Sequence, residues 1–72
     1  MNASELVTID PDILGGTPVF KGTRVPTKTL FDYLADGLSL DYFLESFPSV
    51  SRELAVKILR NSQRELEHHA AA

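Results

Sequence analysis

The sequence predicts a mainly α fold, in which three helices follow a short N-terminal β arm. Two observations lead to this prediction. Three of the four glycines and two of the four prolines fall within residues 15–26, where they bracket two short β-favouring pieces. From residue 27 onward, apolar residues recur with helical spacing, and a glycine and then a proline interrupt the pattern. We therefore expect a single domain over residues 1–72, with the β arm at about residues 5–26 and the helical part at about residues 27–67.

The β arm is expected to contain one short strand and one folded-back element. The strand is predicted at Leu6–Asp10, where apolar and polar residues alternate. Further along, Val19-Phe20 and Arg24-Val25 flank a turn at Lys21–Thr23, whose glycine can supply a positive φ. Pro26 then prevents further strand pairing and suits the entry to a helix. A well-specified turn that serves folding alone explains the same segment.

Three helices are expected in the second part of the chain. The first begins with Thr27 as its N-cap and ends at Gly37, which can adopt the left-handed conformation of a helix end. The second is capped by Ser39, and the third runs from a cap at Ser49 or Ser51 to about residue 67. Their apolar stripes comprise Leu30, Phe31, Leu34 and Leu38 in the first helix, Leu40, Phe43, Leu44 and Phe47 in the second, and Leu54, Ala55, Ile58, Leu59 and Leu66 in the third.

The shortness of the chain predicts that the domain needs a partner for its stability. A chain of 72 residues buries only about 60% of the surface that its unfolded form exposes, and the absence of cysteine excludes disulfides and thiolate zinc sites. We expect a homodimer formed through the β arm, because unpaired strand edges seek partners and the chain leaves no helix to cover the arm fully. The expected dimer residues are Val7, Ile9, Val19 and Phe20.

No pattern in the sequence indicates a catalytic site, a metal site or a phosphate-binding loop. Such a loop has four residues between its glycines, whereas five residues separate Gly16 from Gly22. Asp10 and Asp12 lack a third acid or a histidine nearby and fit a turn. The adjacent pair His68-His69 points to different sides of a helix and cannot chelate a metal as an i, i+4 pair would. We therefore expect no enzymatic activity, no metal and no cofactor.

The distribution of charge points to the last two helices as a DNA contact. The net charge is −3, yet residues 49–64 carry four bases and one acid. These helices and their short connection have the proportions of a helix-turn-helix, homeodomain-like, whose second helix enters the major groove with its N-terminal end. The expected DNA-binding residues are Ser51, Arg52, Lys57 and Arg60. A helical hairpin with a solvated polar face explains the same pattern, and the connection lacks the glycine common in such turns.

The glycine-rich segment also resembles a known family. From Ile9-Asp10 through Gly-Gly-Thr-Pro-Val-Phe-Lys-Gly-Thr-Arg-Val-Pro it is similar to the signature of the domain-of-unknown-function family 433. The positions that match this signature are Gly16, Pro18, Gly22, Thr23 and Arg24. The resemblance extends over roughly Val7 to Arg64. It implies a compact helix-turn-helix-like domain, whose relatives often look like the antitoxin half of small bacterial toxin–antitoxin pairs with a PIN-type ribonuclease as the toxin.

The resemblance and the charge pattern lead to two hypotheses about function. The first is a cytoplasmic antitoxin that neutralises a PIN-like ribonuclease toxin and, as a dimer, binds its operator DNA and represses its own operon. The toxin is expected to contact Tyr33 and Tyr42, because aromatic anchors dominate interface energies. Arg24 is expected to lock the β arm onto the helices by hydrogen bonds. The alternative is a protein–protein interaction module without DNA binding, which the acidic net charge favours. The lack of cysteine and of any apolar run near ~20 residues fits a cytoplasmic protein without membrane contact.

Overall fold

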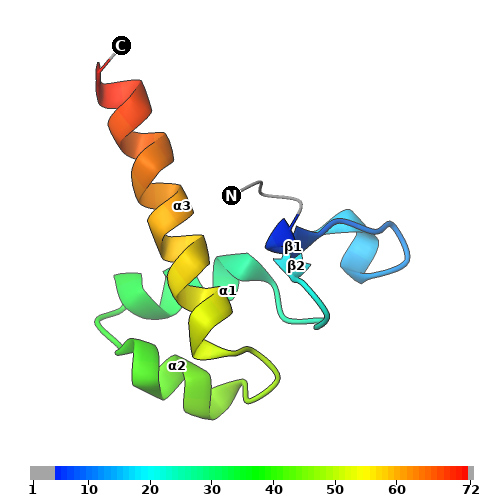
Figure 1. Ribbon diagram of the computed structural model, residues 1–72. Coiled ribbons are helices and arrows are strands. Elements are labelled where there is room, and N and C mark those ends of the chain that lie inside the picture. The colour runs from blue at the N-terminus through cyan, green and yellow to red at the C-terminus, as the bar shows by residue number, and fades with distance from the viewer. Residues whose placement is uncertain (1–4, 72) are drawn as a thin grey trace.

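Three helices follow a small β arm in the computed structural model, which describes residues 5–71 and the side chains as far as residue 67 (Figure 1). The mainly α fold with an N-terminal β arm is confirmed. In chain order the elements are β1 (Val7–Thr8), the 3-10 turn η2 (Leu14–Gly16), β2 (Val19–Phe20), α1 (Thr27–Ala35), α2 (Leu40–Ser46) and α3 (Arg52–Ala71). Among the described residues, no helix is both long enough and apolar enough to cross a membrane.

The β arm is a small antiparallel arrangement with β2 at its centre. On one side β1 pairs with β2, with Val7 opposite Phe20 and Thr8 opposite Val19. On the other side Val19 bridges to Pro26, and the amide of Phe20 donates to the carbonyl of Val25 at 2.9 Å. The folded-back element predicted at residues 19–25 is therefore present.

The first strand is shorter than the alternating pattern predicted. The sequence indicated Leu6–Asp10, whereas β1 covers Val7–Thr8 alone. Asp10 ends it, because its carboxylate accepts a hydrogen bond from the amide of Asp12 and its carbonyl accepts one from the amide of Ile13, both at 2.9 Å. This turn chemistry competes with strand pairing.

The hydrophobic core joins the β arm to all three helices. Its buried residues are Leu6, Phe20, Leu30, Phe43, Val50, Ala55 and Ile58. The rings of Phe20 from β2 and Phe43 from α2 lie 5.9 Å apart between centroids, so an aromatic contact connects the arm to the helices. The core therefore lies where the arm meets the helices.

This core corrects the expected dimer surface. Val19 and Phe20 are 0% exposed within one chain, and Phe20 belongs to the core that the helices complete. The expectation that these two residues are left uncovered is therefore wrong. Val7 is partly buried against the core, and of the four expected dimer residues only Ile9 is exposed, at 65%.

The helix ends follow the cap chemistry of the sequence with one shift. The N-cap of α1 is Pro26 and not Thr27, which is already the first helical residue and whose amide donates to the carbonyl of Pro18 at 3.1 Å. After α1, Gly37 has a φ of 83°, and the amides of Gly37 and Leu38 donate back to the last turn of the helix. This pattern is a Schellman motif, which satisfies the final carbonyls of the helix.

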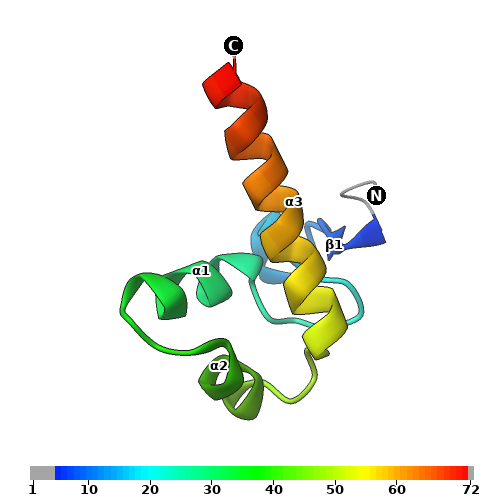
Figure 2. The same ribbon diagram turned by 60° about the vertical axis from the view of Figure 1, so that its left-hand side comes forward.

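The third helix continues well past the core. The hydroxyl of Ser51 accepts a hydrogen bond from the amide of Leu54 at 3.1 Å and so caps its start. The helix was expected to end near residue 67, whereas α3 runs to Ala71. Figures 1 and 2 show its C-terminal turns projecting away from the other elements, and Leu66 there is 72% exposed. We call the segment 62–67 the overhang of α3.

Candidate nucleic-acid and protein interfaces

The second and third helices form a helix-turn-helix-like unit. Ser39 caps α2 by accepting a hydrogen bond from the amide of Tyr42 at 3.0 Å, and residues 47–51 connect α2 to α3. Val50 in this connection is buried, and its amide donates to the carbonyl of Phe47 at 3.0 Å. The connection is thus a tight turn anchored in the core, which holds the two helices in a defined relation without a glycine.

Two of the three bases expected to contact DNA form ion pairs with acids, one from α2 and one from α3. Arg52 forms an ion pair with Asp41 of α2, and Lys57 forms one with Glu53 at 2.8 Å. Arg60 is exposed and makes no hydrogen bond or ion pair with the described part of the chain. Of the predicted set Ser51, Arg52, Lys57 and Arg60, only Arg60 is therefore a cation without a local counter-charge.

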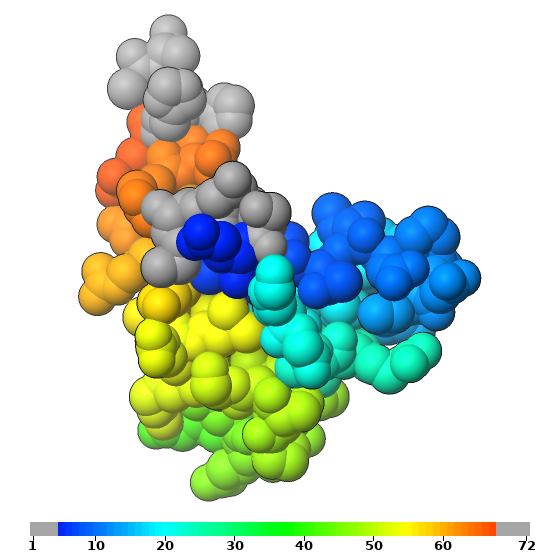
Figure 3. Space-filling model, turned by 45° about the vertical axis from the view of Figure 1, so that its right-hand side comes forward, coloured from blue at the N-terminus to red at the C-terminus, as the bar shows by residue number. Residues whose placement is uncertain are grey.

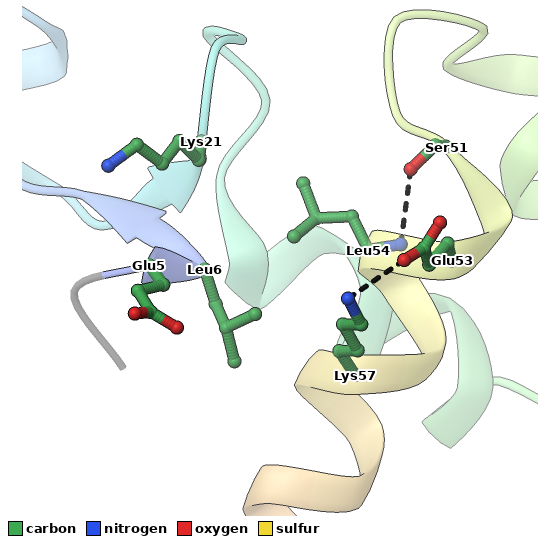
Figure 4. A pocket seen from close by; sticks show the side chains of 7 residues that line it. All are labelled: Glu5, Leu6, Lys21, Ser51, Glu53, Leu54 and Lys57. Carbon is green, nitrogen blue, oxygen red and sulfur yellow. Dashed lines mark hydrogen bonds and ion pairs between the residues drawn. The ribbon is translucent and has the colours of Figure 1, made fainter. Parts of the chain in front are cut away.

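The charges at the start of α3 shift the pKa of one carboxyl group, that of Glu53. The pKa of Glu53 lies below its ordinary value, mainly because Lys57 donates a hydrogen bond to the carboxylate and also through the positive charge of that lysine. Figure 4 shows this pair, with its dashed contact, and Ser51 bonded to the backbone of Leu54. The pair leaves the first turns of α3 close to neutral.

A shallow hollow of about 410 Å³ separates the β arm from the start of α3 (Figure 4). Its walls are Glu5, Leu6 and Lys21 from the arm and Ser51, Glu53, Leu54 and Lys57 from α3. In Figure 4 the ammonium group of Lys21 points along the arm, away from Lys57. The charged groups do not converge on a common point, so the hollow is a boundary between two surface elements and not a built pocket.

An aromatic platform lies on the face formed by α1 and α2. Tyr33 and Tyr42 are stacked, with centroids 5.9 Å apart and planes at 29°. Tyr33 also meets Phe43 and Phe47 edge-on, at 5.6 Å and 5.7 Å, so the stack rests on the core. Tyr42 is 51% exposed, and Leu38 beside the end of α1 is 40% exposed. The platform is therefore packed on the core through Tyr33 and exposed to solvent at Tyr42.

The signature residues divide into those that build the arm and one that is displayed. Gly16 and Gly22 have φ values of 95° and 79°, in the region that favours glycine. Pro18 offers its carbonyl to the amide of Thr27, and Thr23 bonds the backbone of the turn. Arg24, by contrast, is exposed and makes no hydrogen bond or ion pair within the described residues. The expectation that Arg24 locks the arm onto the helices is wrong, since backbone bonds and Phe20 hold the arm.

The described residues include no group of three or more histidine, cysteine, aspartate or glutamate side chains that could hold a metal ion. The side chains of His68 and His69 lie outside the described part. Sequence reasoning missed the role of Asp41 as the partner of Arg52, because a separation of 11 residues across two helices follows no spacing rule. It also had no signal that would place Lys21 beside the start of α3.

Comparisons with known proteins agree with the signature. The profile of the family described as "Protein of unknown function (DUF433)" matches residues 7–60. A curated relative, the uncharacterized protein y4eO of Sinorhizobium fredii (strain NBRC 101917 / NGR234), is 51% identical over 51 residues. That match covers 71% of this chain and 23% of the relative, so the chain spans less than a quarter of that protein. No solved structure matches the chain significantly. Since the matched residues include the arm, α1, α2 and the first half of α3, the chain belongs to the DUF433 family.

Proposed function

We propose that this domain is an antitoxin, which binds a PIN-like ribonuclease toxin through the face of α1 and α2. The observation that supports the proposal is the aromatic platform. Tyr42 is half exposed yet held in place by its stack on Tyr33, so a partner can bury it at a small loss of side-chain freedom. Tyrosine is well suited to this role because it combines a large apolar ring with a polar hydroxyl.

The charge of α2 and of the end of α1 supports a ribonuclease as the partner. Asp36 and Glu45 are exposed and make no ion pair within the described residues, whereas Asp41 is paired with Arg52 of α3. An enzyme that cleaves RNA must bind a polyanion and therefore presents a basic surface to its substrate. An acidic, aromatic face complements such a surface and can occlude it.

The proposal expects a PIN-like ribonuclease in the neighbouring gene, and its test is capture and inhibition of that ribonuclease. Tagged ribonuclease should retain the wild-type domain and lose its activity on RNA when the two are mixed. Tyr42→Ala should weaken both effects, whereas Leu66→Ala, a change at an exposed leucine on the overhang, should leave them intact. Removal of residues 67–72 should also leave binding intact. Equal losses for Tyr42→Ala and Leu66→Ala would contradict the assignment of the face.

A second candidate function is binding of operator DNA. The helix-turn-helix-like order of α2 and α3 favours it, together with the exposed and unpaired Arg60. The pairing of Arg52 and Lys57 with acids favours the alternative, an interaction module without DNA binding. Titration of labelled promoter DNA at about 50 and 200 mM salt separates the two, because binding through phosphates weakens steeply with salt. If the domain does not bind the DNA at the lower salt, the result favours the interaction module without DNA binding.

We also propose that the domain forms a homodimer through exposed apolar residues of the β arm. Ile9 and Leu14 on the arm are 65% and 52% exposed, and neither belongs to the core. Ile9→Asp should shift the mass measured by light scattering from dimer to monomer without altering the circular dichroism of the helices. A wild-type mass equal to that of one chain would exclude the dimer.

A further inference from the structure

The turn between β2 and α1 is built by two of the signature residues. Gly22 takes a φ of 79°, which lets the chain reverse direction directly after the buried Phe20. The hydroxyl of Thr23 donates to the carbonyl of Phe20 at 2.8 Å and accepts from the amide of Val25 at 3.1 Å. The amide of Thr23 donates to the same carbonyl at 2.9 Å. The turn is therefore rigid and anchored at both ends.

This rigid turn displays Arg24. The residue lies between Thr23, which bonds the turn, and Val25, which packs against the core. Its guanidinium is exposed and has no partner among the described residues. The amides of Gly22 and Arg24 likewise donate to no group in this part of the chain. Folding therefore accounts for the conformation of the turn, but it makes no use of the charged group that the turn presents.

The charges around the turn are arranged against the stability of the neighbouring helix. Residues 17–31 contain Lys21, Arg24 and Lys28 and no acid, so bases surround the N-terminus of α1. Asp36 follows the C-terminus of the same helix, which has no acid in its first turn and no base in its last. A helix dipole favours the opposite arrangement. Lys28 does bind Asp32 at 2.6 Å, yet the order base before acid is the weaker one for such a pair. Arg24, by contrast, has no partner within the described residues, and a charge without a structural use indicates a functional cause.

The turn lies on the same side of the molecule as the start of α3. One wall of the hollow includes Lys21, which directly follows β2. The opposite wall includes Ser51 and Lys57, at the start of α3. Figure 3 shows the residues of the turn bulging outward beside those of the α3 start. A rod-like ligand that meets the N-terminal end of α3 therefore passes close to the turn.

We propose that the turn Lys21–Arg24 is a contact site for the phosphate backbone of a nucleic acid, with Arg24 as its main donor. A guanidinium can bind a phosphate through two parallel hydrogen bonds, and an unpaired backbone amide suits the same oxygens. Residues 17–31, which include the turn, contain no acid, and the acid that lines the hollow beside Lys21 is Glu5. It carries no base-reading group and adds affinity without sequence preference. This inference rests on the DNA-binding candidate and is independent of the toxin face on α1 and α2.

The test compares two arginines that are both exposed and unpaired. The probes are a labelled duplex of the chain's own promoter and a labelled duplex of random sequence, titrated at about 50 and 200 mM salt. Arg24→Ala should weaken binding to both duplexes by about tenfold at low salt and lower the slope of log affinity against log salt by about one. Arg64→Ala, the matched control on α3, should change either affinity by less than about twofold.

A conservative variant and a folding control sharpen the outcome. Arg24→Lys should keep the salt slope and lose part of the affinity, because an ammonium keeps the charge but not the planar fork. Arg24→Ala should melt at the wild-type temperature, since the side chain makes no hydrogen bond or ion pair within the described residues. Wild-type affinity of Arg24→Ala, or an equal loss for Arg64→Ala, would overturn the site.

The other outcomes separate this site from the proposed function. If the wild-type domain binds neither duplex yet still inhibits the ribonuclease, the phosphate site fails and the antitoxin proposal stands. If Arg24→Ala no longer binds the ribonuclease but binds DNA as the wild type does, the guanidinium binds a carboxylate of the partner protein. That result also overturns the phosphate site. If the ribonuclease is not bound while Arg24→Ala weakens DNA binding, the site stands without the antitoxin role.

Discussion

Replacement of Phe20 by alanine should destabilise the monomer and not merely dissociate a dimer. Phe20 is 0% exposed and connects the β arm to Phe43 of α2. Removal of a buried phenylalanine ring costs about 3–5 kcal/mol, because transfer energy is lost and a cavity remains. A domain of 72 residues has a free energy of unfolding of about 4–11 kcal/mol. The substitution should therefore remove about a quarter or more of the stability, and in a weakly stable domain nearly all of it.

Urea denaturation followed by circular dichroism measures this loss directly. Phe31→Ala is the matched control, because Phe31 is 37% exposed and lies outside the core, and it should lower the free energy of unfolding by clearly less. Light scattering in the absence of urea then shows whether the mass changes. A Phe20→Ala variant as stable as the wild type but reduced in mass would refute the assignment of Phe20 to the core and restore it to an interface.

Three further outcomes follow from the helix ends and the start of α3. Ser39→Ala should lower the free energy of unfolding by about 1 kcal/mol, because the amide of Tyr42 loses its capping acceptor; an unchanged urea midpoint would contradict this. Gly37→Ala should cost about 1–2 kcal/mol through its φ of 83° alone, since a Cβ there meets no atom within 4 Å, and Gly37→Asn should cost less in the same assay. Lys57→Gln should raise the pKa of Glu53 towards the ordinary value of a glutamate, as read from an NMR titration of its side chain. Because folding lowers this pKa, the pair favours the folded state above the unfolded pKa of Glu53, and that contribution is lost as the pH falls through the folded value.

The local signals in the sequence were sufficient for most of the fold. Gly37, Ser39 and Ser51 mark helix boundaries through chemistry that acts within four residues, and the structure confirms each of them. The length of the first strand was wrong because the alternating pattern continues through Asp10, where turn bonds from the backbone and the carboxylate take over. Boundaries of this kind depend on which of two local bonding patterns is stronger.

The surface was harder to predict, because it depends on contacts between distant segments. The burial of Phe20 requires helices that follow it in the chain, so from the sequence alone this residue was expected to be an exposed apolar group. The pairing of Arg52 with Asp41 likewise arises from the relation of α2 to α3. The sequence indicated both Tyr33 and Tyr42 as surface tyrosines, whereas the structure exposes Tyr42 and packs Tyr33 beneath it against the core.

The overhang of α3 can unfold while the rest of the domain stays packed. Packing against the core ends near Leu59, and the side chains from Gln63 to Glu67 are exposed. A helical segment of so few residues is marginal in water by itself, so its turns persist as an extension of the packed part and open first. Amide exchange should therefore accelerate from Ile58 towards Glu67, and a protease should trim this end stepwise while the remainder resists. Local opening of the overhang thus exposes α3 to cleavage without unfolding of the core.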